Sequence, residues 1–123
     1  MMDWFQIKHG LTLWTGLNMD ALHVHVGVIA QLLAAAVLRR SLASPLPWLL
    51  LLLALCANEW FDLAYETWPN RGDQWGESIK DGWNTMLLPT FLLLISRLAP
   101  SLLVPARPGD QAPLAEELAD AEG

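Results

Sequence analysis

Residues 46–65 read LPWLLLLLALCANEWFDLAY, and this stretch decides the fold. Its first part is a run of leucines without charge, whereas its last part carries Asn58, Glu59 and Asp62. A predominantly apolar stretch of about 20 residues is long enough to cross the ~30 Å hydrocarbon core of a bilayer as a helix. The stretch therefore predicts a membrane-spanning helix that is apolar at one end and polar at the other.

Two further stretches have a similar length on either side of this one. Residues 21–38 read ALHVHVGVIAQLLAAAVL and end at Arg39 and Arg40, and residues 78–98 contain Pro89 in their middle. Both are less apolar than the central stretch, so we expect them to insert as a packed bundle that hides their polar side chains. The predicted fold class is therefore all-α, an integral membrane bundle of three transmembrane helices.

The N-terminal residues 2–17 are predicted to form an amphipathic helix. Trp4, Ile7, Leu11 and Trp14 recur at helical spacing on one side, and tryptophans on an apolar face are typical of helices at the membrane interface. A short helix packed on the rest of the protein is the alternative. The charged residues in this segment argue against a signal peptide.

The C-terminal residues 105–123 differ in composition from the rest of the chain. They contain three prolines and five acidic residues, and their only large apolar residues are Leu114 and Leu118. Such a composition predicts a disordered acidic tail after a membrane domain of residues 1–104.

Composition and charge exclude several function classes. The chain of 123 residues is 54% hydrophobic and has a formal net charge of −6, which argues against binding to nucleic acid. Cys56 is the only cysteine, so an internal disulfide and a thiolate metal cluster are excluded, and we expect it to be a small buried apolar residue. No motif for a nucleotide or another cofactor is present, and none is predicted.

Basic residues predict the orientation in the membrane. Arg39 and Arg40 follow the first span, whereas Arg97 and Arg107 lie at the end of the third span and after it. These ends share one side of the bundle, which the distribution of basic residues assigns to the cytoplasm. The N-terminal helix and the loop of residues 66–77 then face outward, and the C-terminus is cytoplasmic.

Each predicted span carries a polar face near its outer end. At 100° per residue the polar residues of the second span fall within an arc of roughly 120°, and those of the third span within roughly 100°. A stripe of Asp20, His23, Gly27 and Gln31 marks the first span. The candidate ligand-binding residues are Glu59, Asp62, Lys80, Asp81, Asn84, His23, Asn58, Glu66, Glu77 and Arg71.

The inner halves of the same faces are apolar, with Leu52 on the second span and Leu88 and Phe91 on the third. A polar outer half above an apolar inner half predicts an outward-facing acidic pocket and not a pore. Ionisable groups inside spans cost about 2.5–3.5 kcal/mol each on insertion scales and usually mark function.

Structural explanations remain open for part of this set. Asp20, Glu66 and Glu77 are equally well explained as solvated helix ends, and Glu77 also as a cap of the third helix. For Lys80 the alternative interpretation is an ion pair with Glu77 or Asp62 that serves only to join helices.

The sequence His23-Val24-His25 is a weak metal motif. Residues two apart on a helix point in nearly opposite directions, so the two histidines cannot share one ion. A site of His23 with carboxylates from other spans remains a possibility.

The order of the polar residues resembles the VanZ-like family of small bacterial membrane proteins. The resemblance covers about residues 18–98 and rests on Asp20 and His23 near the start of a span, then Glu59 or Glu66, Arg71, Asp81 and Asn84. It implies a multi-pass protein of the bacterial cytoplasmic membrane, associated with the cell envelope or glycopeptide tolerance, without established enzymatic chemistry.

Three function classes follow from these observations. The first is a non-enzymatic membrane protein whose acidic pocket binds a cation or a polar lipid headgroup. The second is a holin-like protein or an accessory subunit, with a membrane partner or further copies of itself. The third is a membrane-embedded metal hydrolase, which needs several converging ligands and a bound water.

Overall fold

The computed structural model describes residues 3–104 and 118–121, and the regular elements of that part are helical. They are α1 (Trp4–Thr15), α2 (Met19–Leu38), α3 (Pro45–Tyr65), α4 (Arg71–Leu98) and the short 3-10 helix η1 (Pro100–Leu102). The all-α prediction is confirmed. Most of the predicted acidic tail lies outside the described residues, and residues 118–121 form one helical turn.

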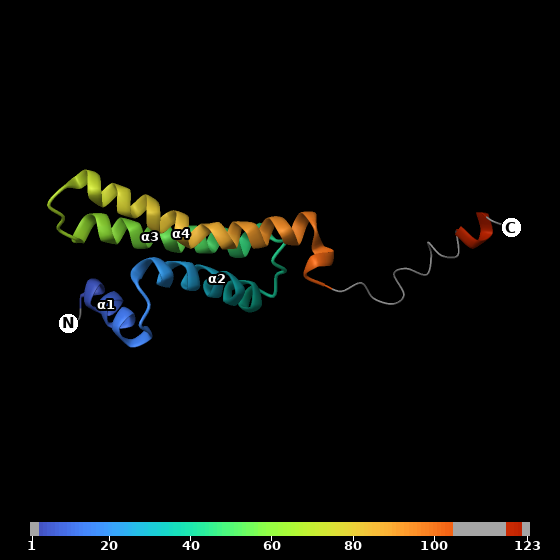
Figure 1. Ribbon diagram of the computed structural model, residues 1–123, viewed down its shortest axis with the longest axis horizontal. Helices are drawn as coiled ribbons and strands as arrows, with labels where there is room; N and C mark the ends of the chain where they lie inside the picture. The colour runs from blue at the N-terminus through green and yellow to red at the C-terminus, as the bar shows by residue number, and fades with distance from the viewer. Residues whose placement is uncertain (1–2, 105–117, 122–123) are drawn as a thin grey trace.

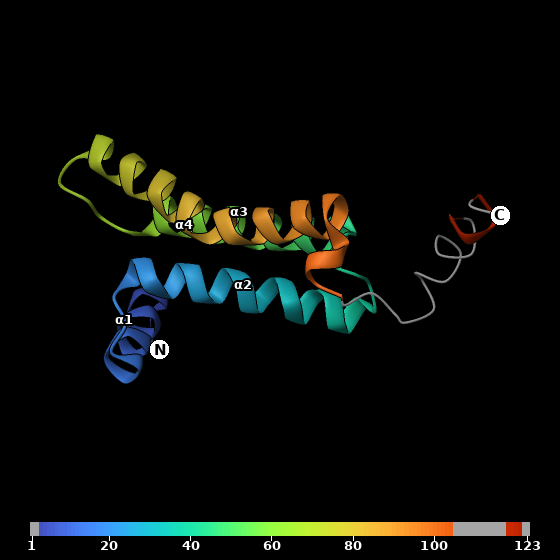
Figure 2. The ribbon, with the colours of Figure 1, turned by 45° about the vertical axis from the view of Figure 1, so that its right-hand side comes forward.

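The three long helices form one elongated bundle. α3 and α4 run side by side, and α2 lies along them (Figure 1). α1 is placed at the end of the bundle where α2 begins, and it runs across the bundle and not along it (Figure 2). The last turn of α3 and the first turns of α4 lie at this same end. Four helix segments therefore meet there.

α4 begins earlier than the sequence predicts. The structure places its first residue at Arg71, about two turns before the predicted start at residue 78. The side chain of Asn70 accepts a hydrogen bond from the backbone N–H of Gly72 at 2.8 Å, which satisfies a donor of the first turn. One alternative for Glu77 was a role as the cap of this helix. The structure contradicts it, because Glu77 lies within the helix.

A close backbone contact joins α2 to α4. A Cβ atom at Gly27 would collide with the carbonyl oxygen of Thr85, so only glycine allows the two helices to approach this closely. Pro89 lacks an N–H, and the Thr85 carbonyl is consequently without its usual partner in the helix. Gln31 is fully buried next to this contact and donates from Nε2 to the carbonyl oxygen of Pro89 at 3.1 Å.

The buried face of α4 differs from the predicted one. Its buried residues are Gln74, Asp81, Thr85 and Pro89. Leu88 and Phe91, which were expected to seal the inner half of the bundle, are 44% and 59% exposed. The Gly27 contact explains the difference, because it turns the side with the smaller residues of α4 toward α2. The prediction that these two side chains close the pocket from below is wrong.

Two of the described helices, α2 and α3, are long and apolar enough to cross a membrane by length and composition. Only 17% and 11% of their apolar windows are buried within the bundle. Large apolar side chains therefore face outward, among them Val37 and Leu53, which are 80% and 65% exposed. Cys56 is also exposed, which corrects the expectation that it is buried.

Candidate functional site

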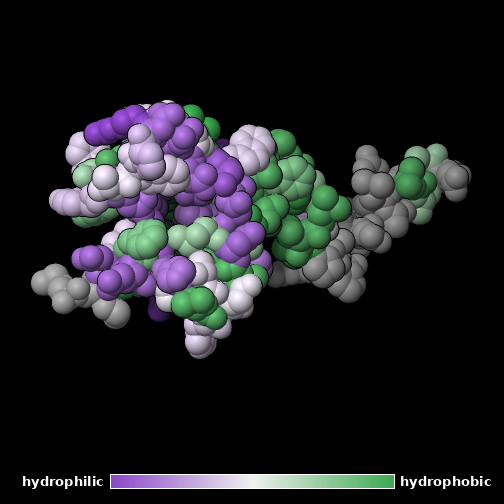
Figure 3. All heavy atoms as spheres, turned by 60° about the vertical axis from the view of Figure 1, so that its left-hand side comes forward, coloured by the Kyte–Doolittle hydropathy of each residue, from purple (hydrophilic) through white to green (hydrophobic). Residues whose placement is uncertain are grey.

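Most ionisable residues of α1 to α4 lie at the end of the bundle where α1 is placed, which we call the polar end. Hydrophilic residues surround a recess at this end, and hydrophobic residues cover the bundle behind it (Figure 3). The recess and its surroundings contain three groups of interacting side chains that adjoin one another. Asn58 Nδ2 donates to Asp62 Oδ2 at 3.2 Å as well as to Glu59 Oε1, and Asp81 lies close to Asp20 and Glu77 as well as to His23 and Glu59. They are described in turn.

The first group connects α1 to the end of α3. Lys8 Nζ lies 2.6 Å from Asp62 Oδ2 and 3.3 Å from Glu66 Oε1, and these side chains are 13%, 11% and 22% exposed. Trp4 Nε1, one helical turn before Lys8, donates to Asn58 Oδ1 at 3.1 Å. An ammonium group from the N-terminal helix therefore contacts two of the predicted acidic residues, and its single positive charge balances one of their two negative charges.

Lys8 was not among the predicted site residues. Helical periodicity placed Trp4, Ile7, Leu11 and Trp14 on one apolar side that was predicted to lie at the membrane interface, and all four are at least 39% exposed. The side that faces the bundle contains Trp4 and Lys8, which are four residues apart and thus on one side of the helix. That spacing was the signal in the sequence that could have identified Lys8.

The second group connects α2 to α4 on the outer flank. Lys80 Nζ lies 2.8 Å from Glu77 Oε1 and 3.1 Å from Asp20 Oδ1, and the three side chains are between 38% and 46% exposed. Asn84 Nδ2 donates to the same Asp20 oxygen at 3.3 Å. Of the two predicted partners, Lys80 therefore pairs with Glu77 and not with Asp62.

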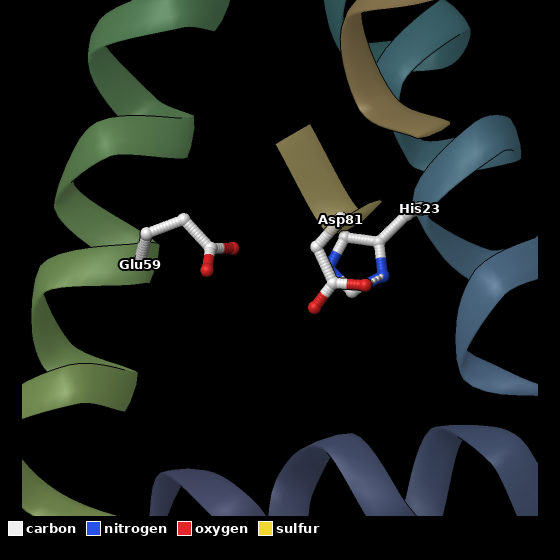
Figure 4. A group of neighbouring side chains, drawn as sticks. All are labelled: His23, Glu59 and Asp81. Carbon is white, nitrogen blue, oxygen red and sulfur yellow. Dashed lines mark ion pairs between the residues drawn. The ribbon is translucent and has the colours of Figure 1, made fainter. Parts of the chain in front are cut away.

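The third group lies between α2, α3 and α4. His23, Glu59 and Asp81 come from these three helices and point toward one another (Figure 4). One ring nitrogen of His23 and one oxygen from each carboxylate all lie within 4.8 Å of one another. His23 is only 15% exposed, so it lies inside the group and not at the rim of a pocket, where it was expected.

Neutral donors hold Glu59 in this group. Ser78 Oγ donates to Glu59 Oε2 at 2.6 Å, and Asn58 Nδ2 donates to Glu59 Oε1 at 3.1 Å. Asp81 is 9% exposed, and its buried Oδ1 has no hydrogen-bond partner within the described residues. Among those residues, no lysine or arginine nitrogen lies within 4 Å of either carboxylate.

Two further residues differ from the prediction. Arg71 is exposed at the start of α4 and forms no ion pair with any described residue, so the structure does not bring it into these groups.

Gln74 was not among the predicted site residues, because it falls in a predicted loop. It is 5% exposed and donates from Nε2 to the carbonyl oxygens of Asp62 at 3.1 Å and Glu66 at 3.4 Å, which positions the end of α3.

Two hollows adjoin the groups. One, of about 690 Å³, lies between α1 and the end of α3 and is lined by aromatic residues together with Asp62 and Glu66. The other, of about 300 Å³, lies between α1, α2 and α3, and Thr85 of α4 also lines it. Its walls are mostly apolar, and Lys8, His23, Asn58 and Thr85 are the polar residues in its lining.

No protein-family model, curated protein or solved structure matches this chain. The resemblance to the VanZ-like family therefore stays a prediction from the order of the polar residues.

Proposed function

We propose that this chain is a small multi-pass membrane protein that binds a cation at its polar end and has no enzymatic activity. The membrane part of the proposal is supported by the length and composition of α2 and α3. It is also supported by the large apolar side chains on the outside of the bundle. A soluble monomer rarely exposes a continuous apolar surface of this kind, whereas lipid chains would cover it.

α4 is the third span in this proposal. Its 28 residues correspond to about 42 Å of helix, which exceeds the ~30 Å hydrocarbon core by roughly eight residues. The excess matches the polar first turns of α4, from Arg71 to Ser78, which would extend into water. The apolar second half of α4, with Phe91 and Leu94 exposed, would then face lipid.

The basic residues support an orientation with the polar end outside. Arg39 and Arg40 follow α2, and Arg97 lies in the last turn of α4, all at the end opposite to α1. Placing this end in the cytoplasm follows the usual bias of basic residues. The resemblance to VanZ-like proteins supports the bacterial cytoplasmic membrane as the location.

The main observation in support of a bound cation is the pair of carboxylates without a lysine partner among the described residues. Four acidic residues of the polar end have a lysine partner, whereas Glu59 and Asp81 face each other without one. Two carboxylates in a partly buried place must bind a cation, take up a proton or reach water. The phosphate of a lipid headgroup would be repelled there. A metal ion or the ammonium of a headgroup provides the matching charge.

Binding can be tested on the purified chain in lipid nanodiscs. At constant ionic strength, at least one of Na⁺, Mg²⁺, Ca²⁺, Zn²⁺ and choline should raise the midpoint of thermal unfolding of the wild type. Asp81→Asn should abolish this shift, whereas Asp73→Asn should retain it, because Asp73 is an exposed acid of the same helix outside the three groups. Absence of any shift in the wild type would refute the proposal.

The topology is tested separately with reporter fusions in bacteria. A reporter placed after Gly123 should be active only in the cytoplasm, and one inserted at residues 70–73 only outside. The reverse pattern would place the polar end in the cytoplasm and contradict the outward orientation.

A further inference from the structure

The side chains of His23, Glu59 and Asp81 have the arrangement of an incomplete metal site. Each comes from a different helix, and their nearest donor atoms lie within 4.8 Å of one another. A tetrahedral ion with bonds of ~2.1 Å requires donor atoms about 3.4 Å apart. The three atoms therefore lie at most about 1.4 Å further apart than such an ion requires.

Hydrogen bonds to neighbouring groups orient two of the three side chains. His23 Nδ1 lies 2.9 Å from the carbonyl oxygen of Met19, so an N–H at Nδ1 leaves the lone pair on Nε2. Glu59 accepts a hydrogen bond from Ser78. Histidines and carboxylates that bind metals commonly have such outer partners, which fix the ring orientation and hold the carboxylate in place.

Asp81 supplies an independent indication that something binds here. Its Oδ1 oxygen is buried without a hydrogen-bond donor, and the nearest basic atom, His23 Nδ1, is 3.5 Å away. That distance is too long for a good hydrogen bond, and the N–H at Nδ1 is already directed to Met19. A buried carboxylate oxygen without a partner is energetically costly, and a bound cation would remove this cost.

From these contacts we infer that His23, Glu59 and Asp81 bind a divalent transition-metal ion of the Zn²⁺ type. This inference rests on the proposed cation-binding function and names the ion class and its ligands. Imidazole nitrogen favours Zn²⁺ and its neighbours in the first transition row over Mg²⁺ and Ca²⁺, which prefer oxygen ligands alone. Three protein ligands also leave one position of a tetrahedral ion open to water or another small ligand.

The structure further indicates one ion and not two. Asp20, Glu77 and Asp81 form a second group of oxygens within 4.8 Å of one another. The ammonium of Lys80 already lies against Asp20 and Glu77 in that group, at 3.1 and 2.8 Å. The expected stoichiometry is therefore one ion for each chain.

The test measures Zn²⁺ affinity by competition with a chelating dye. The chain is purified in nanodiscs with a tag that contains no histidine and is stripped of metal beforehand. His23→Gln should weaken Zn²⁺ binding roughly 100-fold or more, and Ser78→Ala about 10-fold, as expected for an outer partner. His25→Gln is the matched control, because His25 also directs Nδ1 to a backbone carbonyl, at 2.7 Å, but is exposed. The Zn²⁺ affinity of the His25→Gln variant should equal that of the wild type.

The outcomes separate this inference from the proposed function. Tight Zn²⁺ binding that is unchanged in both His23→Gln and Asp81→Asn would place the ion elsewhere and overturn the inference. Binding of Mg²⁺ or Ca²⁺ as tight as that of Zn²⁺, dependent on Asp81 but not on His23, would overturn the inference and leave the cation-binding function intact. Circular dichroism of each variant checks that the helices are retained.

Discussion

The polar end of the bundle and the contact of α2 with α4 around Gly27 are held together in opposite ways. Charged side chains from several helices meet at the polar end, with salt bridges of 2.6 to 3.3 Å. Around Gly27 the backbones of two helices touch, and the single interhelical hydrogen bond of that contact among the described residues is the one from Gln31 to Pro89. One region therefore depends on charge, and the other on shape.

The difference indicates which region serves stability and which is available for function. Close packing of small residues is a general way to join helices in lipid, because the hydrophobic effect contributes little between them there. Charged residues are costly to insert and are not needed for this packing. The Gly27 contact joins α2 to α4 without charged groups, and the ion pair of Lys80 with Asp20 adds a second link between the same helices. Glu59 and Asp81 have no lysine or arginine partner among the described residues, and the proposed cation would account for them.

The largest effect on stability is expected from Gly27→Ala. The added methyl group meets the backbone of Thr85, which no side-chain rotation can move, so we expect a loss of about 3 kcal/mol, the upper end of the usual cost of overpacking. Gly76→Ala in α4 is the control, because nothing lies within 4 Å of the added atom. It should be neutral or stabilise by about 0.5–1 kcal/mol. Unfolding by denaturing detergent measures both, and equal effects would contradict the comparison.

A smaller and more local effect is expected from Lys8→Met. The change removes the charged partner of Asp62 and Glu66, and hydrogen bonds to charged groups contribute about 1.5–3 kcal/mol. Because α1 has no buried residue, we expect it to detach while the rest of the bundle stays folded. Hydrogen exchange of the α1 amides should rise in this variant and remain unchanged in Lys80→Met, which does not touch α1. Unchanged exchange in both would show that α1 is held by other contacts.

The smallest effect is expected from Gln31→Leu. The change removes the hydrogen bond to Pro89, but it also removes Oε1, which is buried without a partner among the described residues. The two consequences offset each other, so stability in the same detergent assay should stay within about 1 kcal/mol of the wild type. A loss as large as that of Gly27→Ala would mean that the contact depends on the hydrogen bond and not on shape.

Much of the fold could be predicted from local patterns, but part of the site could not. The predicted spans 21–38 and 46–65 match α2 and α3 closely, because apolar runs and their ends are local properties. The start of α4 was missed by seven residues, since the cap at Asn70 precedes a polar segment that looks like a loop. The polar end was located in advance, but the ion pairs of Lys8 with Asp62 and Glu66 were not, because they join residues that are 54 and 58 positions apart in the sequence.

The sequence by itself determined that the described elements are helical, that two of these helices are long and apolar enough for a membrane, and that the acidic residues of the long helices lie toward one end of the bundle. These properties depend on composition and spacing along one helix at a time. Only the tertiary structure decided that Glu59 and Asp81 meet His23, while Asp62 meets Lys8. The partners of a side chain depend on how each helix is rotated against its neighbours, and the Gly27 contact with Thr85 sets that rotation for α2 and α4.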